Sequence, residues 1–225
     1  MNRVEAALRG IASDLDELHV RWALVGGFAV SVRTEPRFTR DVDVAVLVSD
    51  DPSAERLVRS LVDRGYCPDA IVEQDAVGRL ATARMISPGA DRLGVVVDVL
   101  FATAGIEPEI VEAAEVLEVL PGVLMPVATA GHLVALKLLA RDDETRPQDS
   151  ADLRAVLGAA DRAAARTAAE LIVDRGFARG RPLHSTHGGV PRGVARVETA
   201  RRKSPGVPPG PPRANRMIIP VNTGG

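Results

Sequence analysis

The chain has 225 residues, 46% of them apolar and 26% charged, with a formal net charge of −2 at pH 7, which is ordinary for a globular protein with one main core. Aromatic residues make up only 3%, so the core must be built from Val, Leu, Ile and Ala, which fits helices packed on a β-branched sheet. The single cysteine, Cys67, excludes an intramolecular disulfide and a thiolate zinc site, and we expect a cytoplasmic protein.

The first nineteen residues predict an amphipathic helix, because they carry acids throughout and lack the continuous apolar core of a secretory signal. Their apolar residues recur at three- and four-residue steps and form one stripe, which should cover the first strand of a sheet. The stripe consists of Val4, Leu8, Ile11, Leu15 and Leu18. The longest apolar stretch, residues 116–140, is broken by Pro121, Pro126 and Lys137, so we expect no membrane span.

Residues 22–32 predict a strand, a tight turn and a helix. The apolar run 22–25 ends at Gly26 and Gly27, and residues 28–32 suit the start of a buried helix. Two glycines at such a turn let backbone N–H groups approach a phosphate closely, and the helix N-terminus adds its partial positive charge. A glycine pair alone is most often simply a turn, so this interpretation depends on the residues that follow.

Two aspartates begin the next predicted strand, residues 41–48. The run is rich in β-branched residues, and its period of two places Asp41 and Asp43 on the same face. Unpaired buried carboxylates are too costly to keep ionised in an apolar strand, so the pair suggests a cation between them, and oxygen-only ligands favour magnesium or manganese. The alternative is a strand whose first residues reach solvent.

A third aspartate interrupts a later apolar strand. Residues 52–64 first predict a helix, and residues 80–86 a strand that turns into the strand 94–101. That last strand is apolar except for Asp98, and burial gives no reason for an acid there. If the two aspartate strands are neighbours, the three carboxylates can hold two divalent ions about 3.5–4 Å apart, an arrangement that clamps the attacking and leaving oxygens in nucleotidyl displacement.

The rest of the ordered chain predicts mainly helices. Residues 115–126 contain two short strand-like runs around a Pro-Gly turn, which favours a hairpin, and Thr129 is a candidate N-cap for the helix that follows. The helical segments are residues 107–114, a segment that begins at Thr129, residues 150–157 and residues 161–175.

The C-terminal tail differs in composition from the rest of the chain. Residues 181–225 contain eight of the sixteen prolines and eight basic residues against a single acid, Glu198, and such a segment cannot bury enough apolar surface to fold. We therefore predict a core at 1–128, packed helices at 129–178 and a disordered tail at 179–225. The tail could bind RNA nonspecifically, but a solvated extension is the favoured interpretation.

These motifs together resemble the nucleotidyltransferase superfamily typified by DNA polymerase beta. They are a Gly-Gly turn, a spacer, Asp-x-Asp on a strand and a later lone strand aspartate. Within that superfamily, the residues VGG at 25–27, RFTRDVD at 37–43 and LKLLA at 136–140 resemble the AbiEii/AbiGii-type bacterial toxin group. The resemblance covers residues 20–157. It implies an α+β fold, a small mixed β-sheet with packed helices.

The resemblance also implies an activity, the metal-dependent transfer of a nucleoside monophosphate from a nucleoside triphosphate to an acceptor hydroxyl, with release of pyrophosphate. Asp41 and Asp43 would bind the Mg²⁺ or Mn²⁺ that carries the triphosphate. Asp98 would help to bind a second ion and to deprotonate the acceptor. Such chemistry is mostly positioning and charge neutralisation.

Further nucleotide-binding residues follow from the same resemblance. Gly26 and Gly27 would present backbone donors to the departing pyrophosphate, and Lys137 would meet the triphosphate. A lysine can also snorkel from the margin of a buried stripe to water. Asp149 and Asp152 match the family's spaced acids, but we favour for both a structural role as acids that stabilise the N-terminus of a helix.

The segment before the acidic strand carries three arginines and a threonine. Arg33, Arg37 and Thr39 could contact phosphate or acceptor, since an arginine fork suits phosphate oxygens. Equally, the arginines could pair with the two neighbouring aspartates when metal is absent. Arg40 alternates to the opposite strand face and is a weaker candidate.

The acceptor is not determined by the residues. The resemblance implies RNA, in particular transfer RNA, with an antitoxin protein encoded alongside as partner. The alternatives are an enzyme that modifies antibiotics or protein hydroxyls, and an inactive module that binds a nucleotide or a partner. The excess of acids over bases outside the tail argues mildly against RNA, although a local arginine patch could suffice.

Overall fold

The computed structural model describes residues 2–36, 38–74, 77–89, 94–140, 147–177 and 217–218, and these ranges contain eight strands and seven helices. The strands are β1 (Trp22–Leu24), β2 (Val42–Val46), β3 (Cys67–Gln74), β4 (Arg79–Ile86), β5 (Val96–Leu100), β6 (Glu115–Leu120), β7 (Val123–Val127) and β8 (Met217–Ile218). The helices are α1 (Arg3–Glu17), α2 (Gly26–Arg33), α3 (Asp51–Asp63), α4 (Glu107–Glu112), α5 (Ala130–Ala140), α6 (Pro147–Ala159) and α7 (Arg162–Asp174).

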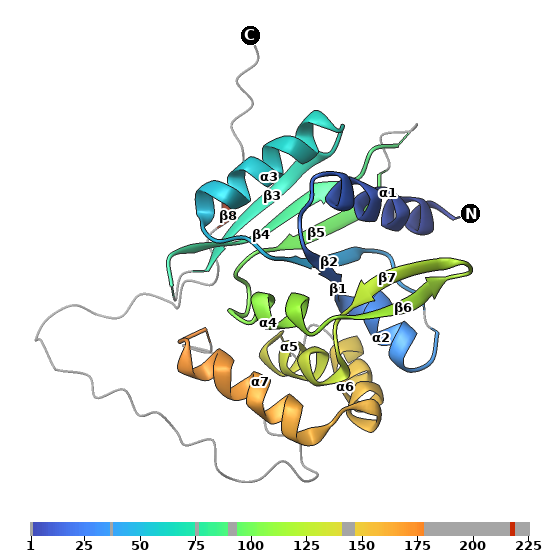
Figure 1. Cartoon of the computed structure of the whole chain (residues 1–225), viewed down its shortest axis with the longest axis vertical. Helices are drawn as coiled ribbons and strands as arrows, with labels where there is room; N and C mark the ends of the chain where they lie inside the picture. Colours follow the sequence, from blue (N-terminus) through green and yellow to red (C-terminus); the bar gives the residue numbers. More distant parts are fainter. Residues whose placement is uncertain are drawn as a thin grey trace, which may run out of the picture.

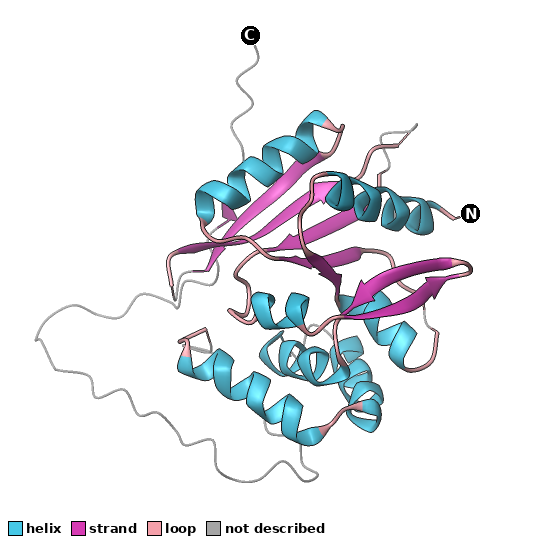
Figure 2. Ribbon diagram, in the orientation of Figure 1, coloured by secondary structure: helices cyan, strands magenta, loops and turns pink. Residues whose placement is uncertain are grey.

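The strands form a single mixed sheet in the order β6-β7-β1-β2-β5-β4-β3-β8. The pairs β1–β7 and β2–β5 are parallel, and the other neighbours are antiparallel. Helices α1 and α3 lie on one side of this sheet, and α4 and the C-terminal helices lie on the other, as Figures 1 and 2 show. This architecture confirms the predicted α+β fold with a small mixed sheet.

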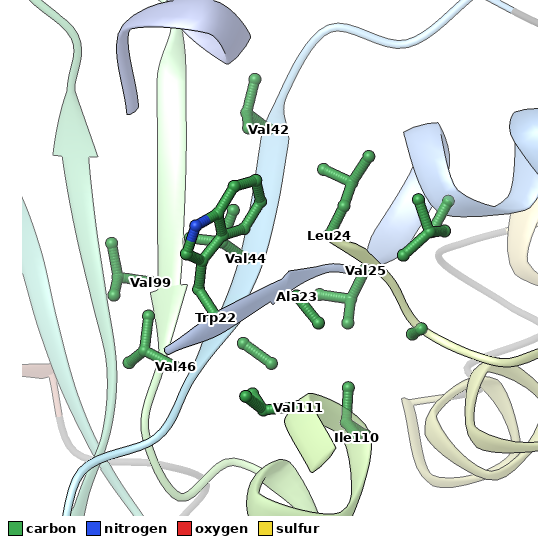
Figure 3. Packing of buried hydrophobic residues seen from close by; sticks show 14 of the residues in the cluster. Trp22, Ala23, Leu24, Val25, Val42, Val44, Val46, Val99, Ile110 and Val111 are labelled. Carbon is green, nitrogen blue, oxygen red and sulfur yellow. The ribbon is translucent and has the colours of Figure 1, made fainter. Parts of the chain in front are cut away.

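The centre of the sheet is buried on both faces. Strand β1 pairs with β2 in the register Trp22↔Val46 and Leu24↔Val44, and all of these residues are buried. Trp22 lies on the face of the sheet that α1 covers, and its indole N–H donates to Asp16 of α1 at 2.8 Å. Ala23 lies on the opposite face, toward α4 (Figure 3). An apolar sheet centre of this kind gives the polar side chains at the strand ends a fixed frame.

The predicted N-terminal helix is confirmed as α1. Leu8, Ile11 and Leu15 are fully buried, while Val4 and Leu18 are partly buried at the ends of the stripe. The side chain of Asn2 accepts a hydrogen bond from the Glu5 N–H, which caps the helix. The stripe therefore lies against the sheet, as expected.

Strand β3 was not predicted. Its sequence, CPDAIVEQ, includes Pro68 and Asp69, which are disfavoured in strands, and it has no clean alternation. It nevertheless pairs along its whole length with β4, with register shifts between Pro68 and Ala70 and between Val72 and Glu73. Asp69 is therefore the extra residue of a β-bulge, which bends the strand and changes the direction of its side chain.

The predicted hairpin and the helix after it are confirmed. Strands β6 and β7 are joined by a turn in which Gly122 has φ +73°. Thr129 precedes α5, and its hydroxyl accepts a hydrogen bond from the His132 N–H at 3.3 Å. Helix α6 begins three residues before the predicted segment 150–157 and ends two residues after it.

Helices α5, α6 and α7 form the helical layer next to the site. A Cβ added to Gly131 of α5 would lie 3.1 Å from the backbone nitrogen of Ala165 in α7, so the two helices are in close contact there. Below the sheet, Arg175 at the end of α7 binds Glu109 of α4, with Nη1 2.9 Å from Oε2. These contacts fix α5, which carries Lys137.

The predicted division at residues 128 and 178 stays a prediction. Residues 178–216 and 219–225 lie outside the described part, so the structure does not describe most of the tail. Residues Met217–Ile218 form β8 at the edge of the sheet and pair with Ile71 and Val72 of β3. In the described part of the chain, no helix has both the length and the apolar stretch needed to cross a membrane.

Removal of residues 181–225 tests this division. We expect the melting temperature to change by no more than about 2 °C, because a segment of this composition cannot bury enough apolar surface to add to the core. A chain that ends after Ala160 is the control: it also removes α7, whose Ala165 and Ile172 are buried, and it should melt at a clearly lower temperature. Differential scanning calorimetry measures both. A clear drop for the first truncation would mean that the pairing of Met217–Ile218 with β3 contributes to folding.

Candidate active site

Three polar side chains form a row across neighbouring strands. Asp43 of β2 is the register partner of Asp98 of β5, and Asp98 is in turn the partner of Arg84 of β4. Adjacent strands lie about 4.8 Å apart, and residues directly opposite one another share a face of the sheet. The sequence predicted that the two aspartate strands are neighbours, and the parallel pairing of β2 with β5 confirms it.

The folded protein disfavours the ionised form of Asp43. Burial, followed by repulsion from Asp98 and Asp41, raises the pKa of Asp43 to about 6 from an ordinary value of 3.8, although Lys137 and a hydrogen bond from the Gly27 N–H act in the opposite direction. Nearby like charges disfavour the ionised form of Asp43. The site therefore attracts positive charge.

Asp41 lies one residue before β2 and is exposed, whereas Asp43 is half-buried. Its carboxylate still acts on the row, since its charge contributes to the raised pKa values of both Asp43 and Arg84. The open alternative, that the first residues of this strand reach solvent, therefore holds for Asp41 and only in part for Asp43.

The glycine turn lies directly against Asp43. Gly26 has φ +62°, and a Cβ added to it would lie 1.9 Å from the Asp43 carboxylate oxygen Oδ2. The Val25 N–H donates to the backbone oxygen of Asp43 at 3.0 Å. The turn thus needs glycine both for its left-handed backbone and for the approach of an acid. Contact of Gly26 and Gly27 with a phosphate stays a prediction.

Arg84 is a site residue that the sequence analysis missed. Its Nε donates to Asp98 Oδ1 at 2.9 Å and its Nη2 to Oδ2 at 2.7 Å, so the guanidinium binds both carboxylate oxygens. This bond to Asp98 raises the pKa of Arg84. The available signal was the alternation of β4, in which Ala81, Ala83 and Met85 are buried and Arg84 shares the opposite face.

Lys137 points into the protein and not to solvent. Its Nζ lies 2.8 Å from Oδ2 of Asp152, and the two side chains are 15% and 2% exposed. The favoured helix-terminus role is wrong for Asp152, because this residue lies in the second turn of α6, where a buried carboxylate needs a cationic partner. The charge of Lys137 also lowers the pKa of Asp43. The side chain of Asp149 lies outside the described part.

The candidates before β2 differ in their positions. Arg33 donates Nε to the Ala128 oxygen at 2.5 Å and binds Glu115 at 2.8 Å, so it joins α2 to the β6–β7 hairpin. Its carboxylate partner is Glu115, which decides against the open alternative of a pair with the two aspartates, and its contact with phosphate or acceptor stays a prediction. Thr39 is half-buried, and its Oγ1 is buried without a hydrogen-bond partner in the described part of the chain. Arg37 lies outside the described residues. Arg40 is exposed and lies over the ring of Phe38, 5.8 Å from its centroid.

The acids of this row fit a hard divalent cation. Their donors are carboxylate oxygens, which suit magnesium and manganese, and a cation would relieve the repulsion that raises the pKa of Asp43. As placed, no group of three or more His, Cys, Asp or Glu side chains within the described ranges could hold a metal ion. Both oxygens of Asp98 are bound to Arg84, so the expected three-carboxylate cluster is not assembled in this state.

Comparison with known proteins gives a family and a fold. A family model described as "Nucleotidyl transferase AbiEii toxin, Type IV TA system" matches residues 11–214. The crystal structure of ANT(2″)-Ia in complex with adenylyl-2″-tobramycin is 16% identical, covers 75% of this chain and 95% of its own, and has a TM-score of 0.51, which supports the fold. No curated protein matches.

Two further solved structures are similar at lower TM-scores. The lincomycin-bound lincosamide antibiotic adenylyltransferase LnuA is 16% identical over 71% of this chain and 100% of its own, with a TM-score of 0.47. An antigenic nucleotidyltransferase-like protein from Paracoccidioides brasiliensis is 18% identical over 79% of this chain and 90% of its own, with a TM-score of 0.47.

Substitution of Gly26 by alanine tests the contact with Asp43. We expect Gly26→Ala to lower the free energy of unfolding by more than the roughly 1–2 kcal/mol of a left-handed alanine, because the new Cβ meets Asp43. Gly78→Ala is the matched control, since Gly78 has φ +63° and a Cβ there would meet nothing within 4 Å. Urea unfolding of both variants measures the difference. Equal losses would contradict the contact.

The raised pKa of Asp43 predicts a pH-dependent stability. The folded state holds this proton more tightly than the unfolded chain, so stability is lost as pH rises from 3.8 to about 6. In EDTA, Asp43→Asn should therefore melt above the parent at about pH 7.5, and the advantage should vanish near pH 4.

The control for this titration is Asp50→Asn. Asp50 caps α3, and its hydrogen bonds with Ser53 lower the pKa of its carboxyl. Because that shift has the opposite sign, Asp50→Asn should give no gain at neutral pH. Melting curves across the pH range decide the matter, and an Asp43→Asn protein that is less stable than its parent at neutral pH would contradict the crowding of the acids.

Proposed function

Because the chain belongs to the AbiEii family of nucleotidyltransferase toxins, we propose that it transfers a nucleoside monophosphate from a nucleoside triphosphate to an acceptor hydroxyl, as the toxin of a type IV toxin–antitoxin system. The observation that carries the proposal is the register pairing of Asp43 with Asp98 beside the Gly26 turn. A structural role does not require two carboxylates opposite one another on central strands, since their repulsion disfavours the folded state.

In the proposed reaction, Asp41 and Asp43 would hold the divalent ion, Mg²⁺ or Mn²⁺, that carries the triphosphate, and Asp98 would help to hold a second ion and would face the acceptor. When bound, the ion neutralises charge on the transferring phosphate and orients it. The acceptor oxygen bonds to the α-phosphorus as the bond from that phosphorus to the bridging oxygen breaks, and pyrophosphate leaves. The hydroxyl proton passes to the Asp98 carboxylate.

The triphosphate has cationic and N–H partners on two helices. The N-terminus of α2, at Gly26 and Gly27, lies beside Asp43, and a helix N-terminus favours phosphate oxygens. Lys137 of α5 acts on the same carboxylate and is positioned by its pair with Asp152. We propose that Lys137 contacts the triphosphate from this fixed position, and that Arg37 and Thr39 contribute from the segment before β2.

For the acceptor we propose RNA, with transfer RNA as the first candidate. Two features support this choice, the toxin family and an exposed aromatic residue near the acids. Phe38 is 78% exposed and carries Arg40 over its ring, three residues before Asp41. Unpaired RNA bases stack on aromatic rings and on arginine planes. A cognate antitoxin protein is the second proposed partner.

Transfer of labelled nucleoside triphosphates to total RNA, protein extract and an aminoglycoside tests the proposal directly. We expect label on RNA, and Asp43→Asn or Asp98→Asn should reduce it by about a hundredfold or more, since charge neutralisation supplies several kcal/mol of barrier reduction. Asp51→Asn is the control, because Asp51 binds Arg79 away from the row. Label on the drug or on protein alone would mean that the drug or the protein is the acceptor and RNA is not. No transfer at all would favour an inactive binding module.

A further inference from the structure

The pair of Arg84 with Asp98 is placed where the proposed reaction needs a free carboxylate. Both hydrogen bonds are short, 2.9 and 2.7 Å, and the Asp98 side chain is only 12% exposed. A bidentate guanidinium uses the two oxygens that would bind a cation or receive a proton. It also places a positive charge on Asp98, the acid in the middle of the row and the register partner of Asp43.

We propose that Arg84 competes with a divalent cation for Asp98, so that the carboxylate row opens only when a metal ion displaces the guanidinium. This inference rests on the proposed function and adds a positioning residue to it. A magnesium ion binds carboxylate oxygens at about 2.0–2.1 Å and cannot share them with a bidentate arginine. If the ion takes one oxygen of Asp98, loss of the bidentate arginine leaves the second oxygen to accept the proton of the acceptor hydroxyl.

The surroundings of Arg84 allow it to leave Asp98. Its side chain is 43% exposed, so it is free on one side, and the charges of Asp41 and Asp69 also act on it. Asp69 is the extra residue of the bulge in β3, between Pro68 and Ala70, and Ala70 is the register partner of Arg84. Bulges commonly redirect a side chain next to a site. A displaced guanidinium therefore keeps an acidic neighbour and is not left unpaired.

The same strand contains a matched pair outside the row. Arg79 of β4 binds Asp51 with Nε 3.0 Å from Oδ1, and these side chains are 36% and 35% exposed. The two arginine–aspartate pairs resemble each other in chemistry, and they differ in that only Arg84 holds an acid of the row. Arg79→Met is therefore the control for the loss of an arginine from β4.

Titration of the full chain with Mn²⁺, followed by electron paramagnetic resonance of the free ion, tests the competition without any measurement of activity. We expect Arg84→Met to bind Mn²⁺ roughly tenfold more tightly than the parent, Arg84→Lys to fall between them, and Arg79→Met to match the parent. The gain should disappear when Asp98→Asn is added to Arg84→Met. Melting curves confirm that each variant is folded, and the lysine variant keeps the test valid if the methionine variant does not fold.

The outcomes separate this inference from the proposed function. If Mn²⁺ binding depends on Asp43 but Arg84→Met and Arg84→Lys bind it no more tightly than the parent, the competition is wrong and the metal site stands. A gain that survives in the presence of Asp98→Asn would also overturn the competition. If Mn²⁺ binding is absent or is unaffected by Asp43→Asn, the metal site of the proposed function fails, and the inference fails with it.

Discussion

Repulsion between two carboxylates held side by side is the interaction on which the site depends. The register of β2 and β5 leaves Asp43 and Asp98 no way to separate, because both strands are fixed by an apolar core on each face. Positive partners reduce this repulsion. The Arg84 guanidinium binds Asp98, while Lys137 and the N–H of Gly27 interact with Asp43. Each of them occupies a place where a phosphate or its counterion would interact with the same acids.

A buried ion pair between two helices holds Lys137 near the candidate site. Lys137 lies on α5 and Asp152 on α6, and removal of either partner would take from the other a nearby opposite charge, which is costly for a buried ion pair. The position of the lysine therefore depends on the packing of α5 against α6 and α7. The C-terminal helices therefore position a residue of the candidate site, through the Lys137–Asp152 pair.

The parts of the site that the sequence could predict are those encoded locally. A β-branched run, a glycine pair and an isolated strand aspartate are patterns of only a few residues, and each is sufficient to predict a strand or a turn. The strands and the helix that they predict are observed. Arg84 and the Lys137–Asp152 pair were missed or misjudged because they depend on strand register and helix packing between distant segments. Strand β3 was missed because Pro68 and Asp69 have low strand propensity. Its pairing with β4 outweighs that propensity.

The parallel pairing of β2 with β5 also has a consequence for folding. The chain between these strands contains α3 and the β3–β4 hairpin, so Asp43 and Asp98 can meet only after a long crossover has closed, which is a slow class of contact. Local hairpins form earlier. A nascent chain therefore has no assembled row of acids until β5 has been synthesised, and a truncated product that ends before β5 would lack Asp98 and with it the row.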